Sequence, residues 1–139
     1  LVDMKRRRLI NNKPLNIRRR SDKWQGLSPV QDDKEFFQFL CAAYGWRAAF
    51  VILTKSYYAK RGIKTIEGII RRWAPSSENN TEGYIRRVCE YTGLSRSLIL
   101  QPPAERPAIW LMIGYAMARV ENGTPDIAVN DMLAGWNML

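Results

Sequence analysis

The amino-acid sequence predicts a mainly α fold, in which a single compact domain of about five helices follows an irregular or short-hairpin N-terminal segment. Apolar residues recur every three to four positions in several segments, and these segments end at Gly or Pro. Turn-forming residues dominate residues 11–39. A length of 139 residues suits one domain, with residues 1–12 as a basic N-terminal arm and residues 13–139 as the folded unit.

Two amphipathic segments predict the first two helices. One helix is expected over residues 43–61 and closes at Gly62, and a second is capped by Thr65 and ended by Pro75. Their large aromatic residues are most simply explained as core. The apolar stripes comprise Trp46, Ala49, Phe50, Leu53 and Tyr57 in the first helix, and Ile66, Ile69, Ile70 and Trp73 in the second.

Two further helices are predicted from caps and stripes, and the N-terminal segment is expected to be held by aromatic residues. Thr81 can cap a helix that ends at Gly93, and Thr124-Pro125 is expected to open the last helix. The last helix has its apolar stripe at Val129, Met132, Leu133 and Trp136. The N-terminal segment is expected to be pinned to the core by Trp24, Phe36, Phe37 and Phe39.

The stretch from Ile109 to Gly123 predicts a buried helix with a carboxylate at its end. From Ile109 to Val120 the only charged residue is Arg119, and a helix that is apolar all round is normally buried. Pro107 suits its first turn, and Asn122-Gly123 after Glu121 forms a good C-cap. The helix dipole and apolar surroundings both disfavour a charged carboxylate there, which predicts a raised pKa and a group suited to general acid catalysis. The alternative is an ordinary surface Glu at a helix end.

The composition excludes several kinds of site. The chain has no His, and its two cysteines, Cys41 and Cys89, are far apart among apolar residues, so we expect buried free thiols rather than a zinc site or a His-based triad. No glycine-rich phosphate loop is present, and we expect no cofactor and no metal. The basic start is not followed by the apolar core of a secretory signal, and no apolar run has the length of a membrane span.

The net charge of +9, from 22 Lys and Arg against 13 Asp and Glu, favours anionic partners such as nucleic acid or the bacterial envelope. Each basic cluster can also be explained as a solvated helix face. If the positive charge binds nucleic acid, the helices could present to phosphates the side chains of Arg71, Arg72, Arg86 and Arg87. We expect such binding to be non-specific at most.

Several motifs resemble those of a family of phage and prophage proteins, usually described as virion structural proteins, that looks related to lysozyme-like cell-wall hydrolases. The Trp-Ala-Pro motif together with Glu-Asn-Asn-Thr is fairly specific in combination. One departure is Lys13, where members of the family tend to have Asn, which weakens a sugar-binding role for that loop. The matching stretches cover residues 11–18, 24–27, 36–39, 44–49, 65–70, 72–75, 78–81, 84–85 and 120–123.

The resemblance implies a lysozyme-like fold in circularly permuted order. In glucosaminidase-like and lytic-transglycosylase-like relatives of lysozyme, a catalytic Glu closes a buried helix, and Asn-Pro-x-Asn-Ile, Trp-x-Gly and Phe-rich segments follow it. In this sequence the later segments come first, and the helix that ends in Glu121 comes last. Chain ends often lie close together at a domain surface, so such a permutation is physically possible.

The resemblance also implies a set of site residues. Glu121 takes the position of the acid, and Glu78 is the best second carboxylate, although acids before a helix also stabilise its N-terminus. A lytic transglycosylase needs only one acid/base, because a hydroxyl of the sugar itself attacks. Stacking and amide hydrogen bonds to a saccharide are expected from Asn16, Trp24, Gln25 and Tyr84, with core packing as the alternative for Trp24.

Three functions remain open at this point. The leading one is a phage or prophage protein that cleaves the peptidoglycan glycan strand at the cell wall or in the periplasm, as a glycoside hydrolase or a lytic transglycosylase. The second is a nucleic-acid-binding virion protein. The third is a structural virion component without catalysis, whose partners would be other virion proteins.

Overall fold

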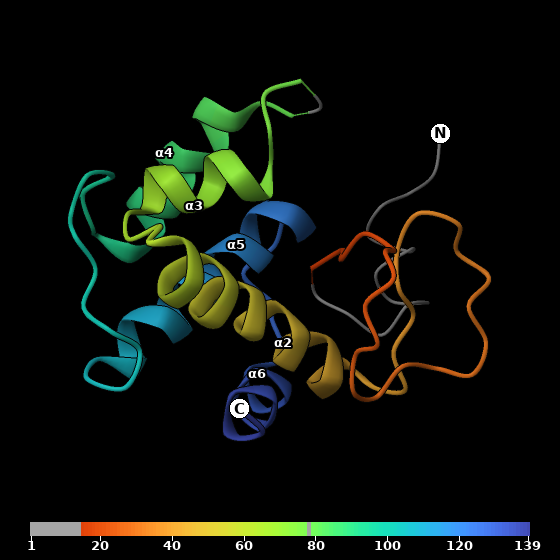
Figure 1. Ribbon diagram of the computed structural model, residues 1–139. Helices are drawn as coiled ribbons and strands as arrows, with labels where there is room; N and C mark the ends of the chain where they lie inside the picture. Colours follow the sequence, from red (N-terminus) through yellow and green to blue (C-terminus); the bar gives the residue numbers. More distant parts are fainter. Residues whose placement is uncertain (1–14, 78) are drawn as a thin grey trace.

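The computed structural model describes residues 15–77 and 79–139 and confirms a mainly helical domain (Figure 1). No strand is formed in these two ranges, apart from isolated bridges between single residues. The first helix is continuous but changes type, from an α-helical to a π-helical half. The elements are α2 (Ala42–Val51), η1 (Ile52–Lys60), α3 (Ile66–Trp73), α4 (Thr81–Thr92), α5 (Pro107–Asn122) and α6 (Val129–Asn137).

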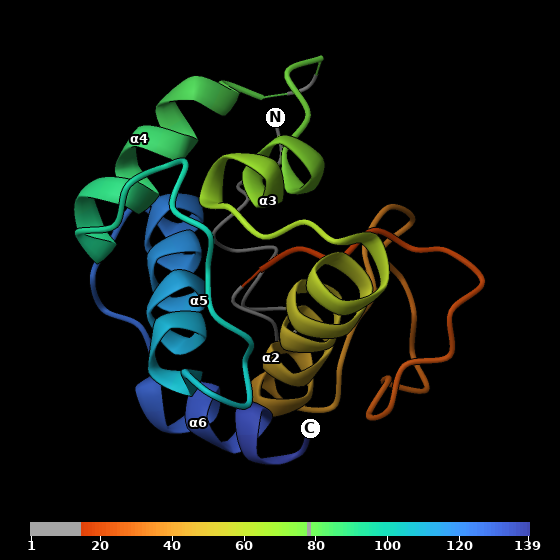
Figure 2. The ribbon, with the colours of Figure 1, turned by 60° about the vertical axis from the view of Figure 1, so that its left-hand side comes forward.

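Helix α5 and the rod formed by α2 and η1 lie side by side, with α6 across one end and α3 and α4 near the other (Figure 2). The predicted helix is confirmed, but it is buried along one face rather than all round: Trp110, Ile113 and Met117 of α5 have no exposed surface, whereas Met112 is 42% exposed. It begins at Pro107 and ends at Gly123, whose φ of +67° favours glycine. The architecture thus carries Glu121, in the last turn of α5, toward α3 and α4.

The rod matches the predicted boundaries of residues 43–61, but the sequence did not predict its π-helical half. The rod closes before Gly62, which has a φ of +67°. Inside it, the Thr54 hydroxyl donates to the Phe50 carbonyl oxygen at 2.7 Å, a side-chain bond that competes with the regular helical pattern. Because π-helical segments often occur at functional sites, this half of the rod is of interest for the site.

Two predicted helix starts require correction. Thr65 does cap α3, accepting from the Gly68 amide at 3.1 Å. The cap of α4, however, is Asn80 rather than Thr81, because the Asn80 carboxamide accepts from the Gly83 amide at 3.1 Å. The Thr81 hydroxyl instead donates to the carbonyl oxygen of Ala74, which ties the start of α4 to the end of α3.

The last helix begins at Val129, later than the predicted start at Thr124-Pro125. The Thr124 hydroxyl accepts from the Asp126 amide at 3.2 Å, so this Thr-Pro pair forms a turn before the helix rather than its first turn. The predicted stripe is correct only in part. Met132 is buried and Trp136 is half-buried, but Val129 and Leu133 are exposed.

The segment of residues 15–39 is an irregular ribbon beside the helices, as predicted (Figure 1). Isolated antiparallel bridges join Arg18 to Phe36 and Leu27 to Phe39. Of the aromatic residues expected to pin the ribbon, Phe37 and Phe39 belong to the core and the partly buried Trp24 packs against it, whereas Phe36 is buried outside the core cluster. The buried apolar side chains of the ribbon are Leu15, Ile17, Phe36, Phe37 and Phe39.

Within residues 15–77 and 79–139, no helix is both long enough and apolar enough to span a bilayer.

A candidate active-site groove around Glu121

An open groove of about 1140 Å³ runs between the ribbon, the rod, α3 and the end of α5. Its walls mix aromatic, amide and charged side chains, which is the composition of saccharide sites, where rings stack and amides hydrogen-bond. Three of the residues predicted from the sequence, Asn16, Trp24 and Tyr84, line this groove together with Glu121. Gln25 is exposed and does not line it.

The carboxyl group of Glu121 is half-buried and held by side chains from two other helices. Its Oε2 accepts a hydrogen bond from Trp73 Nε1 at 2.9 Å and another from the Tyr84 hydroxyl at 2.7 Å. Trp73 is the last residue of α3, and Tyr84 lies in the first turn of α4.

The structure gives Trp73 and Tyr84 a contact with Glu121 that the sequence did not predict. The Trp73 side chain was expected in the core, and it packs against the core with its ring while its N–H reaches the carboxyl group. Tyr84, expected to contact sugar, is 9% exposed and acts on Glu121. These two donors are positioning residues: they fix the orientation of the carboxyl group.

The amide of Asn16 and the indole N–H of Trp24 are the other predicted sugar-binding groups. Both side-chain polar atoms of Asn16, and Trp24 Nε1, are buried without a hydrogen-bond partner. A buried polar group without a partner costs on the order of 1–3 kcal/mol, and such groups usually have a functional explanation. Both residues come from the ribbon and line the groove, although these polar atoms themselves are shielded from solvent.

Glu78, the candidate predicted for a second carboxylate, lies outside the described residues, so its role stays a prediction. Asp22, in the ribbon, lines the groove, and it is the only other carboxylate among the described residues that do so. It is exposed. Sequence analysis missed Asp22 because it stands among turn residues, without a periodic pattern that would place it near Glu121.

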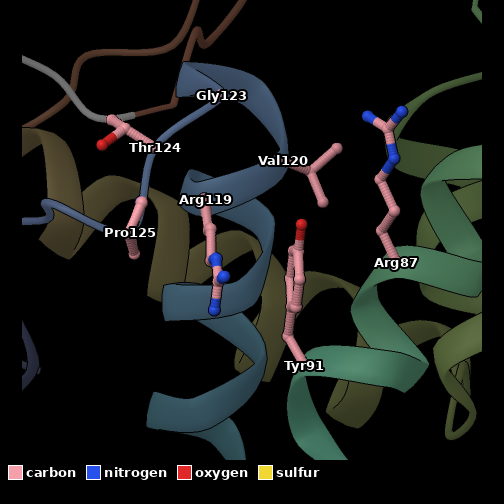
Figure 3. A pocket seen from close by; sticks show the side chains of 7 residues that line it. All are labelled: Arg87, Tyr91, Arg119, Val120, Gly123, Thr124 and Pro125. Atoms are coloured by element: carbon pink, nitrogen blue, oxygen red, sulfur yellow. The ribbon is translucent and has the colours of Figure 1, made fainter.

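Only two of the four arginines proposed for nucleic acid line the groove. Arg71 and Arg72 line the groove, whereas Arg86 and Arg87 are exposed on α4 and do not. Arg87 lines a second hollow of about 230 Å³, shown in Figure 3. There the Arg119 guanidinium lies 4.0 Å from the centre of the Tyr91 ring, and Figure 3 shows Arg87 and Arg119 extending in different directions rather than toward one point.

Arg71 is neutralised by an ion-pair network on the surface. It contacts Glu67 at 3.0 Å and Glu82 at 2.6 Å, and Arg96 contacts the same two carboxylates at 3.1 and 2.9 Å. Hydrogen bonds from Arg96 and Arg71 lower the pKa of Glu82 from 4.5 to about 2. The network joins α3, α4 and the loop before α5, and it stabilises the arrangement of the two helices that hold Glu121.

This network predicts an acid-dependent loss of stability. Because the pKa of Glu82 is lower in the folded protein, its contribution is complete above pH 4.5 and is lost as the pH falls from 4.5 to about 2. We expect the Tm of the wild type to fall more over this window than that of Glu82→Gln, with Glu90→Gln, an exposed Glu on the same helix, as control. Equal slopes for Glu82→Gln and the wild type in thermal melts would contradict the assignment.

The described residues contain no cluster of three Cys, Asp or Glu side chains that could hold a metal ion. Cys41 and Cys89 are free, as predicted, but the expectation that they are buried is wrong: Cys41 is exposed and Cys89 is half-buried. What the groove offers chemically is therefore one oriented carboxyl group beside aromatic and cationic side chains.

The comparison with known proteins supports a phage relationship. No protein-family model matches the chain. Over 133 residues, the chain is 38% identical to Protein P5 of Pseudoalteromonas phage PM2, in an alignment that covers 94% of this chain and 79% of that protein. The phage relationship indicated by the sequence motifs is thereby confirmed, while the relationship to lysozyme-like enzymes stays a prediction. The chain belongs to the family of phage protein P5.

Proposed function

We propose that this protein is a phage-associated enzyme that cleaves the glycan strand of peptidoglycan, with Glu121 as the general acid. The observation that carries the proposal is the carboxyl group of Glu121, which is oriented by Trp73 and Tyr84 at the wall of an open groove. General acids are normally held in this way by groups from the surrounding fold. A phage protein with this activity would act at the bacterial cell wall, either as part of the virion or during release.

The groove favours chemistry with one carboxyl group over chemistry with two. Among the described lining residues, Glu121 accepts hydrogen bonds from Trp73 and Tyr84. The Asp22 side chain is exposed and has no hydrogen-bond donor within the described residues. A lytic transglycosylase needs one acid/base. Glu121 would protonate the glycosidic oxygen as the C1–O bond breaks, and its carboxylate would then take the proton of the sugar's own C6 hydroxyl as that oxygen bonds to C1. No water is consumed, and Glu121 is regenerated.

The ribbon supports the proposal of a permuted lysozyme-like fold. Asn16 and Trp24 come from segments that would follow the catalytic Glu in lysozyme-like relatives. Here they precede it in the chain, and yet they line the same groove. This is the arrangement that a circular permutation predicts, because permutation changes the order of segments along the chain and preserves their places in space.

The products of cleavage test this function. The protein is incubated with purified sacculi, and the released fragments are analysed by mass spectrometry. We expect fragments that end in 1,6-anhydro sugars. Absence of any released fragment would contradict the enzymatic proposal and favour a non-catalytic virion role. Ends that carry oxygen from solvent would show hydrolysis instead.

Two amide variants test the number of carboxylates. With a single acid/base, both Asp22→Asn and Glu78→Gln should retain activity to within about threefold, because neither side chain exchanges a proton with the substrate. The rate of fragment release from sacculi is compared with that of the wild type. A loss of about 100-fold in either variant would identify a second catalytic carboxylate and contradict the single-acid mechanism.

A further inference from the structure

Three arginines from three different elements surround Tyr57 at the groove. Arg20 belongs to the ribbon, Arg61 follows the π-helical half of the rod, and Arg72 lies on α3; all three line the groove with Tyr57. The Arg72 guanidinium lies 5.7 Å from the centre of the Tyr57 ring. Burial raises the pKa of the Tyr57 hydroxyl, and the charges of Arg72, Arg20 and Arg61 oppose that shift, so all three lie within electrostatic reach of it.

None of these three arginines forms an ion pair with a residue of the described ranges 15–77 and 79–139. This distinguishes them from Arg71, whose charge is matched by Glu67 and Glu82. All three side chains are exposed, so solvent screens their mutual repulsion and their guanidinium groups remain available to an anionic ligand. The cluster formed by Arg20, Arg61 and Arg72 therefore indicates an anion-binding part of the groove.

The rest of the groove restricts which anion fits. Glu121 and Asp22 line the same groove, so a polymer with a charge on every unit would meet carboxylates as well as arginines. A neutral chain with separate anionic branches avoids this repulsion. Peptidoglycan is such a polymer: its glycan backbone is uncharged, and its peptide stems carry carboxylates, which guanidinium groups bind with short, charge-assisted hydrogen bonds.

We propose that Arg20, Arg61 and Arg72 bind the carboxylates of peptide stems, so that the groove takes stem-bearing peptidoglycan in preference to bare glycan. This rests on the proposed function, because it assigns a substrate class to the same groove. The arginines lie beside the site of cleavage and would place the strand relative to Glu121. The preference is one of binding, and the arginines take no part in proton transfer.

The test uses a double variant with a matched control. Arg20→Gln/Arg61→Gln removes two charges of the cluster, and Lys55→Gln/Arg106→Gln removes two exposed charges that do not line the groove. Each is made in the wild type for cleavage assays and in Glu121→Gln for binding assays. The probes are stem-bearing glycan oligomers, the same oligomers stripped of stems by an amidase with the lactyl carboxylates so exposed converted to neutral amides, and a single-stranded oligonucleotide.

We expect the wild type to prefer stem-bearing oligomers by about tenfold, in binding and in cleavage, and the preference to shrink at high salt. Arg20→Gln/Arg61→Gln should bind and cleave both glycans only as well as the wild type binds and cleaves stripped glycan. Lys55→Gln/Arg106→Gln should keep the preference for stem-bearing glycan. Equal handling of both glycans by the wild type would overturn the stem proposal and leave the cleavage function intact. Binding without cleavage by the wild type would contradict the cleavage function and leave stem binding intact.

Two other outcomes would also overturn the stem proposal. One is equal loss of the preference in both double variants, because the effect would then come from net charge rather than from the groove. The other is tighter binding of the oligonucleotide than of stem-bearing glycan, abolished by Arg20→Gln/Arg61→Gln, which would assign the arginine cluster to nucleic acid.

Discussion

Replacing Glu121 with Gln is expected to lower the rate of glycan cleavage by a factor of about 100 to 1,000. The carboxamide keeps the size of the side chain and can still accept the hydrogen bonds from Trp73 Nε1 and the Tyr84 hydroxyl through its carbonyl oxygen. It has no proton that it can give to a glycosidic oxygen. The loss therefore reports on proton transfer rather than on folding or on the shape of the groove.

The measurement is the release of soluble muropeptides from purified sacculi, with Glu90→Gln as the matched control. Glu90 is exposed on α4 and does not line the groove. We expect the control to release fragments at the rate of the wild type, and we expect both variants to unfold cooperatively near the Tm of the wild type. Equal rates for the wild type and Glu121→Gln would remove Glu121 from the reaction.

Gly135→Ala is expected to lower the free energy of unfolding by about 2–3 kcal/mol. A Cβ atom added at Gly135 would lie 2.5 Å from Trp46 Cβ, 2.7 Å from the Ala43 carbonyl oxygen and 2.8 Å from the Arg47 amide nitrogen. Two of these atoms belong to the backbone of α2 and cannot turn away, so α6 would have to move off the rod. This cost should exceed the gain of about 1 kcal/mol that Ala normally brings to a helix interior.

Urea unfolding of Gly135→Ala and Ala134→Leu separates close packing from the general effect of added volume. Ala134 is the preceding residue of α6 and is exposed, so its replacement should change stability by no more than about 0.5 kcal/mol. If Gly135→Ala is as stable as the wild type, or more stable, then the contact between α6 and the rod is not tight.

The fold was predictable where local chemistry decides it. Thr65 caps α3 because its hydroxyl is placed to accept from Gly68, and Gly93 and Gly123 end their helices with φ values of +73° and +67°. The late start of α6 was not predictable in this way, because a Thr-Pro pair suits both a helix start and a turn. The π-helical half of the rod depends on tertiary packing as well as on Thr54, so the apolar stripe alone could not show it.

The candidate site was predictable only along single elements. Glu121 could be recognised because a buried helix, a carboxylate and a C-cap follow one another in the chain. The hydrogen bond from Trp73 to Glu121 could not be predicted, since the position of Trp73 on the apolar stripe predicts only core packing. Arg20, Arg61 and Arg72 belong to three elements, and their meeting around Tyr57 depends on how those elements pack. Spacing within one segment carries no such information.

The most direct test of Glu121 as a general acid is the dependence of the Glu121→Gln defect on the leaving group. A 2,4-dinitrophenolate group leaves a glycan oligomer without being protonated. The leaving oxygen of the natural glycan, by contrast, needs a proton. The account predicts that Glu121→Gln is about 100-fold or more impaired on the natural glycan and at least about tenfold less impaired on the dinitrophenyl substrate, where only its role as base toward the C6 hydroxyl is lost. The same impairment on both substrates would contradict a role in protonating the leaving group.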